Sequence, residues 1–421
     1  MQIYLVGGAV RDIILGKEPH DKDYVVVGST PQEMLDLGYK QVGNEFPVFL
    51  HPETGEEYAL ARKEISTGKG YDDFKFDFNS NITLREDLER RDFTMNALAM
   101  DEKGNIIDYF NGQNDIKNQI IRYVNKEHFI EDPLRVLRAC RFASQLDFMI
   151  DEPTIRLCRN MAKLKMIEHL TEERVWKEIE KALHTPNFAL FLHYLELCNA
   201  IQVILPEISV LADVPEPLDY HPEGNTYTHT LLALKQVKGN TRIDSKERAL
   251  VNFGVMCHDL GKQLTENWPH HHNHETLGLE IVDKMCDRLK IPNDFRDFGK
   301  LAVRYHMDFY KFLDMNVKTQ YDMMEHITKF KDNYKLNLLM TVHVCDLFGK
   351  ARIIPDEDFQ YCAKVITRMN LIYTILHDIG LKDLPQETQE HLSKFKGEKF
   401  GKLYRDAKIS YLKGHLGKNN E

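Results

Sequence analysis

The chain opens with a short apolar segment that passes through two consecutive glycines into a helical segment. Residues 3–6 predict a strand, Gly7 and Gly8 a turn, and residues 9–15 a helix. Such a passage lets backbone N–H groups and the positive end of the helix face an anion, and Arg11 could add a bidentate phosphate contact. The segment predicts an α/β head with a phosphate cradle. Taken alone, a tight turn with a surface arginine fits it as well.

Asp21 and Asp23 flank a lysine at the start of the next predicted strand, residues 23–27. Side chains two residues apart in a strand point to one face, so these carboxylates would repel each other unless a cation lies between them. Oxygen ligands suit Mg²⁺, and two such ions activate a hydroxyl and stabilise a leaving pyrophosphate. Because the glycine turn lies just upstream, we interpret both aspartates as catalytic magnesium ligands rather than as a solvent-facing loop. Glu57, on a later predicted strand, is either a third carboxylate or a surface residue.

An arginine pair occurs in residues 87–97, a segment that changes from polar to apolar. Paired arginines commonly form a salt-bridged helix face. In this segment, Asp92 and Asn96 could instead orient Arg91 or contact a ribose.

A second arginine-rich segment begins with Asp132 and Pro133. Proline suits the first position of a helix, and aspartate suits its N-cap. Arg135, Arg138 and Arg141 recur at every third position and form one basic stripe. They could pair with acids, but three arginines beside a phosphate site favour contact with a ligand.

The rest of the sequence predicts an α/β region at the start of the chain and a helical region after it. Within the head, the sequence pattern predicts further strands at 46–50 and 57–62, a helix at 31–37 and a long functional loop at 66–81. Later segments predict helices at 133–144, 152–164, 172–183 and 188–198, a proline-rich linker at 206–222, and helical regions over 227–348 and from there to the end.

A second constellation combines histidines and aspartates. The pair His258 and Asp259 ends an apolar stretch, with His229 upstream and Asp346 downstream. Imidazole and carboxylate ligands from separate helices suit a hydrolytic metal site. A solitary buried histidine is more often structural, but an adjacent pair with remote partners favours a metal. His274 and His306 stay open as further ligands or as a second site, and the histidines at 270–272 are not assigned as ligands.

The head elements together resemble the class II tRNA nucleotidyltransferases, the bacterial CCA-adding enzymes. The resemblance is carried by residues 5–12, 15–16, Asp21 and Asp23, 90–97 (Arg-Arg-Asp-Phe-Thr-Met-Asn-Ala), and Glu131-Asp132 with Arg135. It extends over nearly the whole chain and is closest to the multifunctional form with a C-terminal HD domain. It implies an α/β nucleotidyltransferase head with a polymerase-β-like mixed sheet, followed by all-α neck, HD and tail regions. We expect these regions at 1–112, 113–205, 226–350 and 351–421.

The resemblance also implies an activity: addition and repair of the 3′-terminal CCA of tRNA from CTP and ATP. Asp21 and Asp23 would hold Mg²⁺, and the nucleotide would be contacted by Gly8, Arg11, Arg91, Arg138 and Arg141. Asp132 and Arg135 resemble the protein template that reads the base, because a carboxylate accepts from an exocyclic amine and a guanidinium donates to ring acceptors. Guanine and uracil would leave buried groups unpaired. The loop at 66–81 would suit the switch from C to A.

The histidine pattern resembles the HD phosphohydrolase superfamily, with His229, His258, Asp259 and Asp346 at the four defining positions. In CCA-adding enzymes with this domain, the resemblance implies phosphatase, 2′-nucleotidase and 2′,3′-cyclic phosphodiesterase activities. It implies Ni²⁺ or another divalent metal as the cofactor.

Net charge, cysteine spacing and the length of apolar runs limit the classes of protein to which the chain can belong. The net charge of −10 argues against a non-specific nucleic-acid coat, although the basic end of the chain, residues 394–418, is either a solvated helix or a phosphate-contacting tail. Seven scattered cysteines without CxxC pairs, no signal peptide and no membrane-length apolar run predict a cytoplasmic protein. We expect a monomer or a homodimer, a choice that these features leave open. The alternatives are a bacterial poly(A) polymerase, an HD phosphohydrolase with an RNA-binding head, and a non-enzymatic tRNA-binding chaperone.

Overall fold

The computed structural model divides into two compact units. The first comprises Met1–Ala182 and Asn187–Ile204, and the second comprises Leu183–Pro186 and Leu205–Glu421. The structure describes residues 1–19, 21–42, 48–66, 74–77, 80–266 and 270–417.

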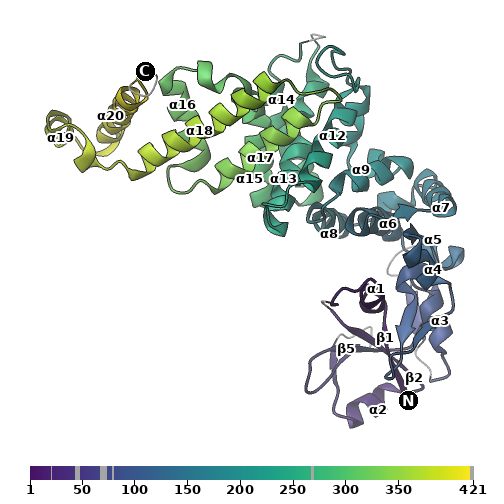
Figure 1. Ribbon diagram of the computed structural model, residues 1–421. Helices are drawn as coiled ribbons and strands as arrows, with labels where there is room; N and C mark the ends of the chain where they lie inside the picture. Colours follow the sequence, from purple (N-terminus) through teal and green to yellow (C-terminus); the bar gives the residue numbers. More distant parts are fainter. Residues whose placement is uncertain (20, 43–47, 67–73, 78–79, 267–269, 418–421) are drawn as a thin grey trace. The chain divides into compact units, whose positions relative to one another are not determined.

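A seven-stranded mixed sheet begins the first unit, with the strand order β3-β4-β5-β2-β1-β8-β9 (Figure 1). Its strands are β1 (Gln2–Val6), β2 (Asp23–Val27), β3 (Lys40–Val42), β4 (Val48–Leu50), β5 (Glu57–Leu60), β8 (Leu98–Met100) and β9 (Ile106–Asp108). β2 runs parallel to β5, and the other neighbours are antiparallel. β2 is central, so its Val25 and Val26 are buried on opposite faces. The mixed sheet expected for the head is confirmed.

Local signals explain the short helices around this sheet. α1 (Gly8–Ile14) follows the glycine turn, and α2 (Pro31–Asp36) and α3 (Leu84–Glu89) begin at capping boxes formed by Thr30 and Thr83. In each box the threonine hydroxyl accepts a hydrogen bond from the backbone N–H of the residue three positions later. That residue is a glutamate, and its carboxylate accepts from the backbone N–H of the threonine. The helix predicted at 31–37 is therefore confirmed to within one residue.

The expectation of a loop over 66–81 is wrong in part. β6 (Lys63–Ser66) and β7 (Phe74–Asp77) form an antiparallel pair in which Ser66 is opposite Phe74. The alternation Phe-Lys-Phe-Asp at 74–77 has the two-residue period of a strand, which the surrounding Gly, Asp and Asn residues obscured. Residues 67–73 and 78–79, and with them most of the predicted loop, lie outside the described residues.

Helices form the rest of the first unit. They are α4 (Gly112–Lys117), α5 (Lys126–Glu131), α6 (Leu134–Leu146), α7 (Glu152–Lys163), α8 (Glu172–Leu183), α9 (Phe188–Leu197) and α10 (Ile201–Ile204), with the short strands β10 (Ile120–Ile121) and β11 (Met149–Ile150). The four helices predicted here are confirmed, with ends that differ by two residues at most. α6 begins at Leu134 with Pro133 at its N-cap, one residue later than predicted, and the predicted cap Asp132 accepts from Leu134 N at 3.1 Å from just before it.

The second unit is helical among its described residues. Its helices are α11 (Pro206–Ser209), η3 (Val210–Asp213), α12 (Thr226–Lys238), α13 (Ser245–Cys257), η4 (Leu260–Leu264), α14 (His274–Leu289), α15 (Asn293–Tyr305), η5 (His306–Asp314), α16 (Val317–Thr328), α17 (Tyr334–Phe348), α18 (Asp356–Asp378), η6 (Leu381–Asp383), α19 (Gln386–Leu392) and α20 (Gly397–Gly417). α13 packs against α12, α15 and α17, and its segment Ala249–Cys257 is buried (Figure 1). No helix in the described parts of the chain is long and apolar enough to cross a membrane.

The proline-rich linker predicted at 206–222 is wrong over its first half, whereas residues 214–222 form neither helix nor strand. Its first half forms α11 and η3, where Ile208 and Leu211 are fully buried. Pro206 stands at the first turn of a helix, a position that needs no N–H donor, so proline starts structure here instead of interrupting it.

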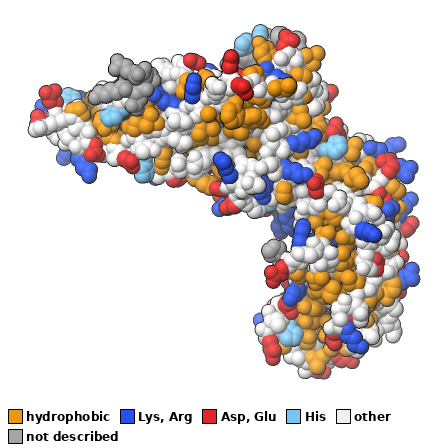
Figure 2. All heavy atoms as spheres, in the orientation of Figure 1, with side chains coloured by type: hydrophobic (Ala, Val, Ile, Leu, Met, Phe, Trp, Pro, Cys, Tyr) orange, Lys and Arg blue, Asp and Glu red, His pale blue; other side chains and the backbone are white. Residues whose placement is uncertain are grey.

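The basic end of the chain forms α20. Arg405 pairs with Asp322 and Glu325 of α16, and the ammonium group of Lys408 lies 5.6 Å from the ring centre of Phe330. On the face drawn in Figure 2, acidic and basic side chains are interspersed. Lys418 lies outside the described residues.

Candidate functional sites

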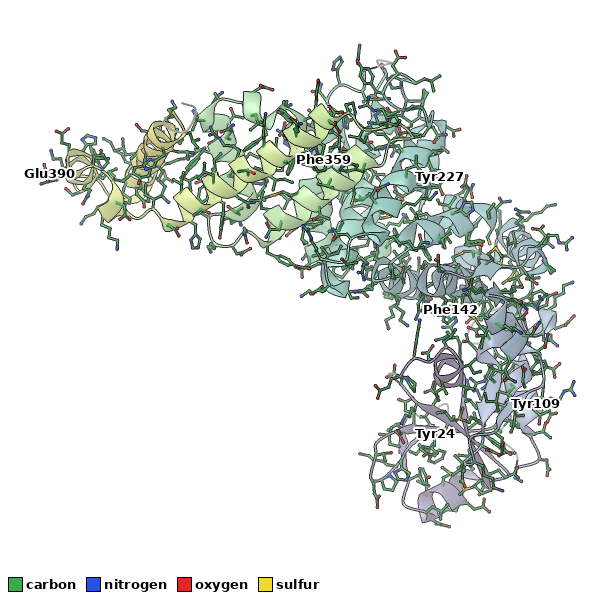
Figure 3. All side chains as sticks on the ribbon, viewed as in Figure 1. Tyr24, Tyr109, Phe142, Tyr227, Phe359 and Glu390 are labelled. Carbon is green, nitrogen blue, oxygen red and sulfur yellow. The ribbon has the colours of Figure 1, made fainter. Side chains whose placement is uncertain are left out.

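A cavity of about 1100 Å³ lies in the first unit, between the sheet and the neck helices. It is lined by every residue predicted for the head site: Gly8, Arg11, Asp21, Asp23, Arg91, Asp132, Arg135, Arg138 and Arg141. Tyr24 of β2 and Phe142 of α6, both labelled in Figure 3, also line it. The structure therefore brings the glycine turn, the carboxylates and both arginine segments to one place.

The glycine turn is dictated by backbone conformation and by a close neighbour. Gly7 has φ 75° and ψ −138°, a region that only glycine occupies readily. A Cβ at Gly7 would lie 2.8 Å from Nη1 of Arg91. The first residues of α1 follow at once, so their backbone N–H groups face the cavity side of the turn. The arrangement suits an anion.

The carboxylates lie across two adjacent strands. Asp23 begins β2 and is aligned with Glu57 of the parallel strand β5, so the two side chains share one face of the sheet. Asp21 precedes β2, and all three residues are exposed and line the cavity. Their oxygens are not within 4.8 Å of one another as a group of three. Exposed oxygen donors without bulky neighbours are the ligands that Mg²⁺ accepts, usually together with water and phosphate oxygens.

A chain of side-chain hydrogen bonds connects α1 to α6. Arg11 donates to Asp12 and, through Nη1 at 2.8 Å, to Oδ1 of Asn96. Asn96 donates to Oδ1 of Asp92, and Arg138 donates to Oδ2 of Asp92 at 2.9 and 2.5 Å. Burial would raise the pKa of Asp92, but Arg138 and Arg135 outweigh it and lower the pKa to about 2. Two of the predicted nucleotide ligands are thus fixed in position by the protein.

The pair expected to read the base is also held by neighbours. Asp132 accepts from Nη2 of Arg174 on α8, at 3.0 and 3.1 Å to its two oxygens. Arg135 donates to two backbone oxygens, of His128 at 2.5 Å and of Arg90 at 2.7 Å. These contacts use two of the five N–H donors of Arg135.

The remaining arginines differ in their partners. Arg91 lies 3.4 Å from Oδ2 of the buried Asp87. Arg141 is buried, donates to Glu178 at 2.5 Å and stacks over Phe142. The basic stripe therefore includes the acid pairing that the sequence left as the alternative.

The second unit gathers the predicted histidines and aspartates around a cavity of about 360 Å³. Oδ1 of Asp346 lies 3.0 Å from Nε2 of His229 and 3.9 Å from Nε2 of His258. Oδ2 of Asp259 lies 3.1 Å from Nε2 of His258 and 3.9 Å from Nε2 of His229. All four side chains are buried and come from α12, the end of α13, and α17.

A neighbouring group shares Asp259. His274 at the start of α14 and His306 at the start of η5 place their Nε2 atoms 3.0 Å apart. Oδ1 of Asp259 lies 3.6 Å from Nε2 of His274 and 3.3 Å from Nε2 of His306. His274 and His306, which the sequence left open as further ligands, therefore both lie close to Oδ1 of Asp259.

The donor set of the second unit fits metal ions. Nε2 of His258 and Oδ1 of Asp259 are buried and make no hydrogen bond with any described residue. Buried polar atoms without partners are costly, and both atoms point into groups of imidazole and carboxylate donors. Mixed nitrogen and oxygen ligands suit a divalent transition metal.

Four functional residues were not singled out in the sequence. Arg174 holds Asp132, and Glu223 accepts from His229 at 3.0 Å. Lys262 donates to Glu216 at 2.7 Å, and its Nζ lies 2.9 Å from Oδ2 of Asp259. Lys262 follows Asp259 by three residues and Glu223 precedes His229 by six, spacings that could have indicated both residues. Arg174 and Glu216 lie 42 and 46 residues from Asp132 and Lys262, respectively.

Three family descriptions match successive parts of the chain. Residues 3–122 match the Poly A polymerase head domain, and residues 147–211 match the probable RNA and SrmB-binding site of polymerase A. Residues 226–339 match the HD domain. The chain joins a poly A polymerase-type head to an HD domain.

Solved structures share this whole fold. The CCA-adding enzyme of Bacillus stearothermophilus in complex with CTP is 24% identical, with a TM-score of 0.61 over 97% of this chain and 87% of that chain. The Thermotoga maritima CCA-adding enzyme complexed with tRNA is 20% identical, with a TM-score of 0.62 over 98% and 87%. A tRNA-processing enzyme with CTP is 23% identical, with a TM-score of 0.60 over 97% and 96%. The expected architecture, a mixed-sheet nucleotidyltransferase-type head followed by helical regions that include an HD domain, is confirmed.

Proposed function

We propose that the chain adds and repairs the 3′-terminal CCA of tRNA, using CTP and ATP with Mg²⁺ held by Asp21 and Asp23. The observation that carries the proposal is the shared cavity: Asp21, Asp23, Asp132 and Arg135 line one space together with the glycine turn. The fold shared with CCA-adding enzymes bound to CTP, ATP or tRNA supports it. The boundary residues of the head and neck proposed from the sequence, 1–112 and 113–205, stay part of this proposal.

In this proposal each residue has a separate task. The turn at Gly7 and Gly8 and the guanidinium groups of Arg11, Arg91 and Arg138 bind and orient the triphosphate and ribose. Bound Mg²⁺ supplies a lowered pKa for the attacking 3′-hydroxyl and balances the charge of the leaving pyrophosphate. Arg141, which is paired with Glu178, supports α6 from the inside.

Base selection follows from donors and acceptors. Cytosine and adenine both present an amine beside an unprotonated ring nitrogen, whereas uracil and guanine present the opposite polarity. Asp132 would accept from the amine, and the free N–H groups of Arg135 would donate to ring and carbonyl acceptors. A wrong base would leave buried polar groups unpaired, which discriminates more strongly than shape.

The test offers a tRNA that lacks its CCA end to the full chain with Mg²⁺ and single or combined nucleotides. We expect addition of C, C and A in that order from CTP and ATP, and no addition by Asp23→Asn. A long A tract would contradict the proposal and identify a poly(A) polymerase. A tRNA that binds but is never extended would identify a binding protein without transfer activity.

We further propose that the HD region, residues 226–350, hydrolyses phosphate esters such as 2′,3′-cyclic nucleotides, 2′-nucleotides and simple phosphomonoesters. His229, His258, Asp259 and Asp346 would hold Ni²⁺ or another divalent metal, and the orphaned atoms of His258 and Asp259 support this. The group of Asp259, His274 and His306 would hold a second ion. When bound, the metal supplies an activated water molecule, while Lys262, paired with Glu216 and Asp259, holds the Asp259 carboxylate in place.

Hydrolysis of 2′,3′-cyclic AMP after metal removal and metal addition tests this proposal. We expect activity to return with Ni²⁺, Mn²⁺ or Mg²⁺ in wild type and not in His258→Ala. Metal-independent hydrolysis, or unchanged hydrolysis in His258→Ala, would contradict it.

A further inference from the structure

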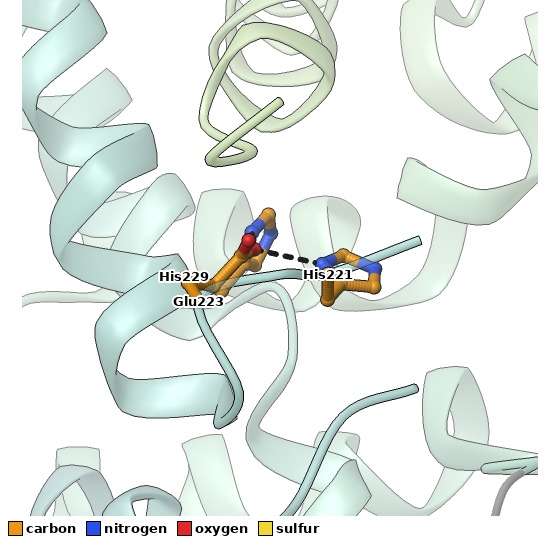
Figure 4. A group of neighbouring side chains, drawn as sticks. All are labelled: His221, Glu223 and His229. Carbon is orange, nitrogen blue, oxygen red and sulfur yellow. Dashed lines mark hydrogen bonds and ion pairs between the residues drawn. The ribbon is translucent and has the colours of Figure 1, made fainter. Parts of the chain in front are cut away.

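A buried carboxylate connects three segments beside the proposed metal centre. Glu223 lies in the loop before α12, and its side chain is only 1% exposed. Oε1 accepts from Nδ1 of His229 at 3.0 Å and from Nδ1 of His221 at 2.9 Å. Oε2 accepts from the backbone N–H of Ala351 at 3.1 Å. Figure 4 shows Glu223 reaching both histidine rings.

The bond to His229 determines which ring nitrogen faces the other ligands. A carboxylate that engages Nδ1 holds the proton there and leaves Nε2 to accept or to bind a metal. Nε2 of His229 is the atom that lies 3.0 Å from Asp346 and 3.9 Å from Asp259. Glu223 therefore aims His229 at the other proposed ligands from behind.

The bond to Ala351 connects the same carboxylate to the far side of the centre. Ala351 follows α17 by three residues, and α17 carries Asp346 near its end. One carboxylate thus holds the segment after the Asp346 helix as well as the His229 ring. The two oxygens of Glu223 thus contact the segments that carry or follow these two proposed ligands.

His221 is held in the same way. With Nδ1 bound to Glu223, its other ring nitrogen is the one available to the cavity that His221 lines. Its ring packs edge-on against His229, with the ring centres 4.8 Å apart. Both rings therefore lie against the same carboxylate oxygen of Glu223.

We propose that Glu223 is the positioning residue of the HD metal centre, which orients His229 through Nδ1 and fixes its distance to Asp346 through Ala351. The inference rests on the proposed function, because it assumes that His229 and Asp346 bind a divalent metal. Glu223 itself does not contact the metal.

The test measures Ni²⁺ affinity of the full chain by calorimetry after chelation. Glu223→Gln keeps the size of the side chain but loses the charge, and we expect about 10- to 100-fold weaker binding. Glu280→Gln is the matched control, because Glu280 is exposed on α14 and pairs only with Lys284 among the contacts described. His221→Ala should change the affinity less than Glu223→Gln, since His229 keeps its carboxylate.

A second measurement does not depend on affinity or folding yield. In the Co²⁺-substituted chain, the Nδ1–H of a coordinated histidine gives a shifted, exchangeable proton resonance. We expect the His229 resonance, identified by its loss in His229→Ala, to exchange slowly in wild type and rapidly in Glu223→Gln and Glu223→Ala.

The outcomes separate two failures. If wild type binds Ni²⁺ and Co²⁺ but Glu223→Gln matches Glu280→Gln in affinity and exchange, the role of Glu223 is wrong and the metal centre stands. If wild type binds neither metal, the metal centre is wrong and the role of Glu223 falls with it.

Discussion

Position 7 combines two separate reasons for glycine. The backbone there has positive φ, and a Cβ would lie 2.8 Å from Nη1 of Arg91. Gly55 also has positive φ, at 71°, but a Cβ there would meet nothing within 4 Å. Alanine at these two positions therefore separates the cost of backbone strain from the displacement of Arg91, which we propose contacts the nucleotide.

We expect Gly7→Ala and Gly55→Ala each to lose about 1 to 3 kcal/mol of stability through strain. Gly7→Ala alone should raise the KM for CTP and ATP, because Arg91 must move. Thermal melting and steady-state kinetics of CCA addition measure the two effects. Equal KM values for both variants would show that Arg91 does not contact the nucleotide.

Asp92 gives the head a defined dependence on pH. Its pKa falls from 3.8 in the unfolded chain to about 2 in the folded chain, since Arg138 and Arg135 outweigh the effect of burial. The stabilisation is fully present above pH 3.8 and is lost as the pH falls through about 2. The shift corresponds to about 2 kcal/mol at neutral pH.

We therefore expect wild type to exceed Asp92→Asn in stability at pH 7, and the difference to shrink as the pH is lowered from 4 towards 2. Chemical denaturation of both proteins at several pH values measures it. A difference that stays constant over this range would mean that Asp92 is not paired as described.

The residues of the head site could be predicted from sequence because short motifs carry them. The strand–glycine–helix pattern and the paired aspartates depend on local spacing, which the chain shows directly. Arg174 and Glu223 could not be predicted in this way. Arg174 lies 42 residues from Asp132, so their contact exists only once separate parts of the chain pack together. Glu223 lies only six residues before His229, but in an irregular loop whose path no periodic pattern in the sequence shows.

At the scale of elements, η4 and α14 approach unusually closely through two facing glycines. A Cβ at Gly261 would lie 1.9 Å from the carbonyl oxygen of His274 and 2.7 Å from the backbone N of Gly278. A Cβ at Gly278 would lie 2.9 Å from the backbone N of Gly261. This contact brings the His274 end of α14 to Asp259, which directly precedes η4.

We expect Gly261→Ala to push α14 away from η4, to cost at least about 3 kcal/mol, and to abolish hydrolysis in the HD region. Gly239→Ala is the control, because its nearest neighbour would be Gln236 O at an ordinary 3.8 Å. Thermal melting and cyclic-nucleotide hydrolysis measure the outcome. Wild-type hydrolysis in Gly261→Ala would show that this spacing does not position His274.

The observed bounds of helices and strands match the predicted bounds where the apolar period and the capping residues indicate the same ends. Helices such as α8 and strands such as β2 have the predicted bounds, because their apolar residues recur at the period of the element. Prediction failed where polar or proline residues dominated the pattern. β7 has only four residues, and α11 and η3 are single turns whose stability comes from buried Ile208 and Leu211.

At the scale of the whole molecule, the two candidate sites belong to different compact units. The carboxylates Asp21 and Asp23 lie in the first unit, and the ligands around His258 lie in the second. Among the described residues, each cavity is lined only by residues of its own unit. Their chemistries should therefore fail separately.

We expect Asp23→Asn to abolish CCA addition and to leave cyclic-nucleotide hydrolysis within about twofold of wild type, since substitutions at sites that share no residues behave additively. His258→Ala should show the reverse. Both activities are measured on the same preparation of each variant. Loss of both activities in either folded variant would contradict the separation.

Asp259 belongs to both groups of proposed ligands, with one oxygen facing His258 and the other facing His274 and His306. Two ions bound there would share a ligand and could not bind independently. Thermodynamic linkage then requires that each ion changes the affinity of the other by the same factor. The HD region would respond to the free concentration of metal in the cell as a coupled pair, and not as two separate sensors.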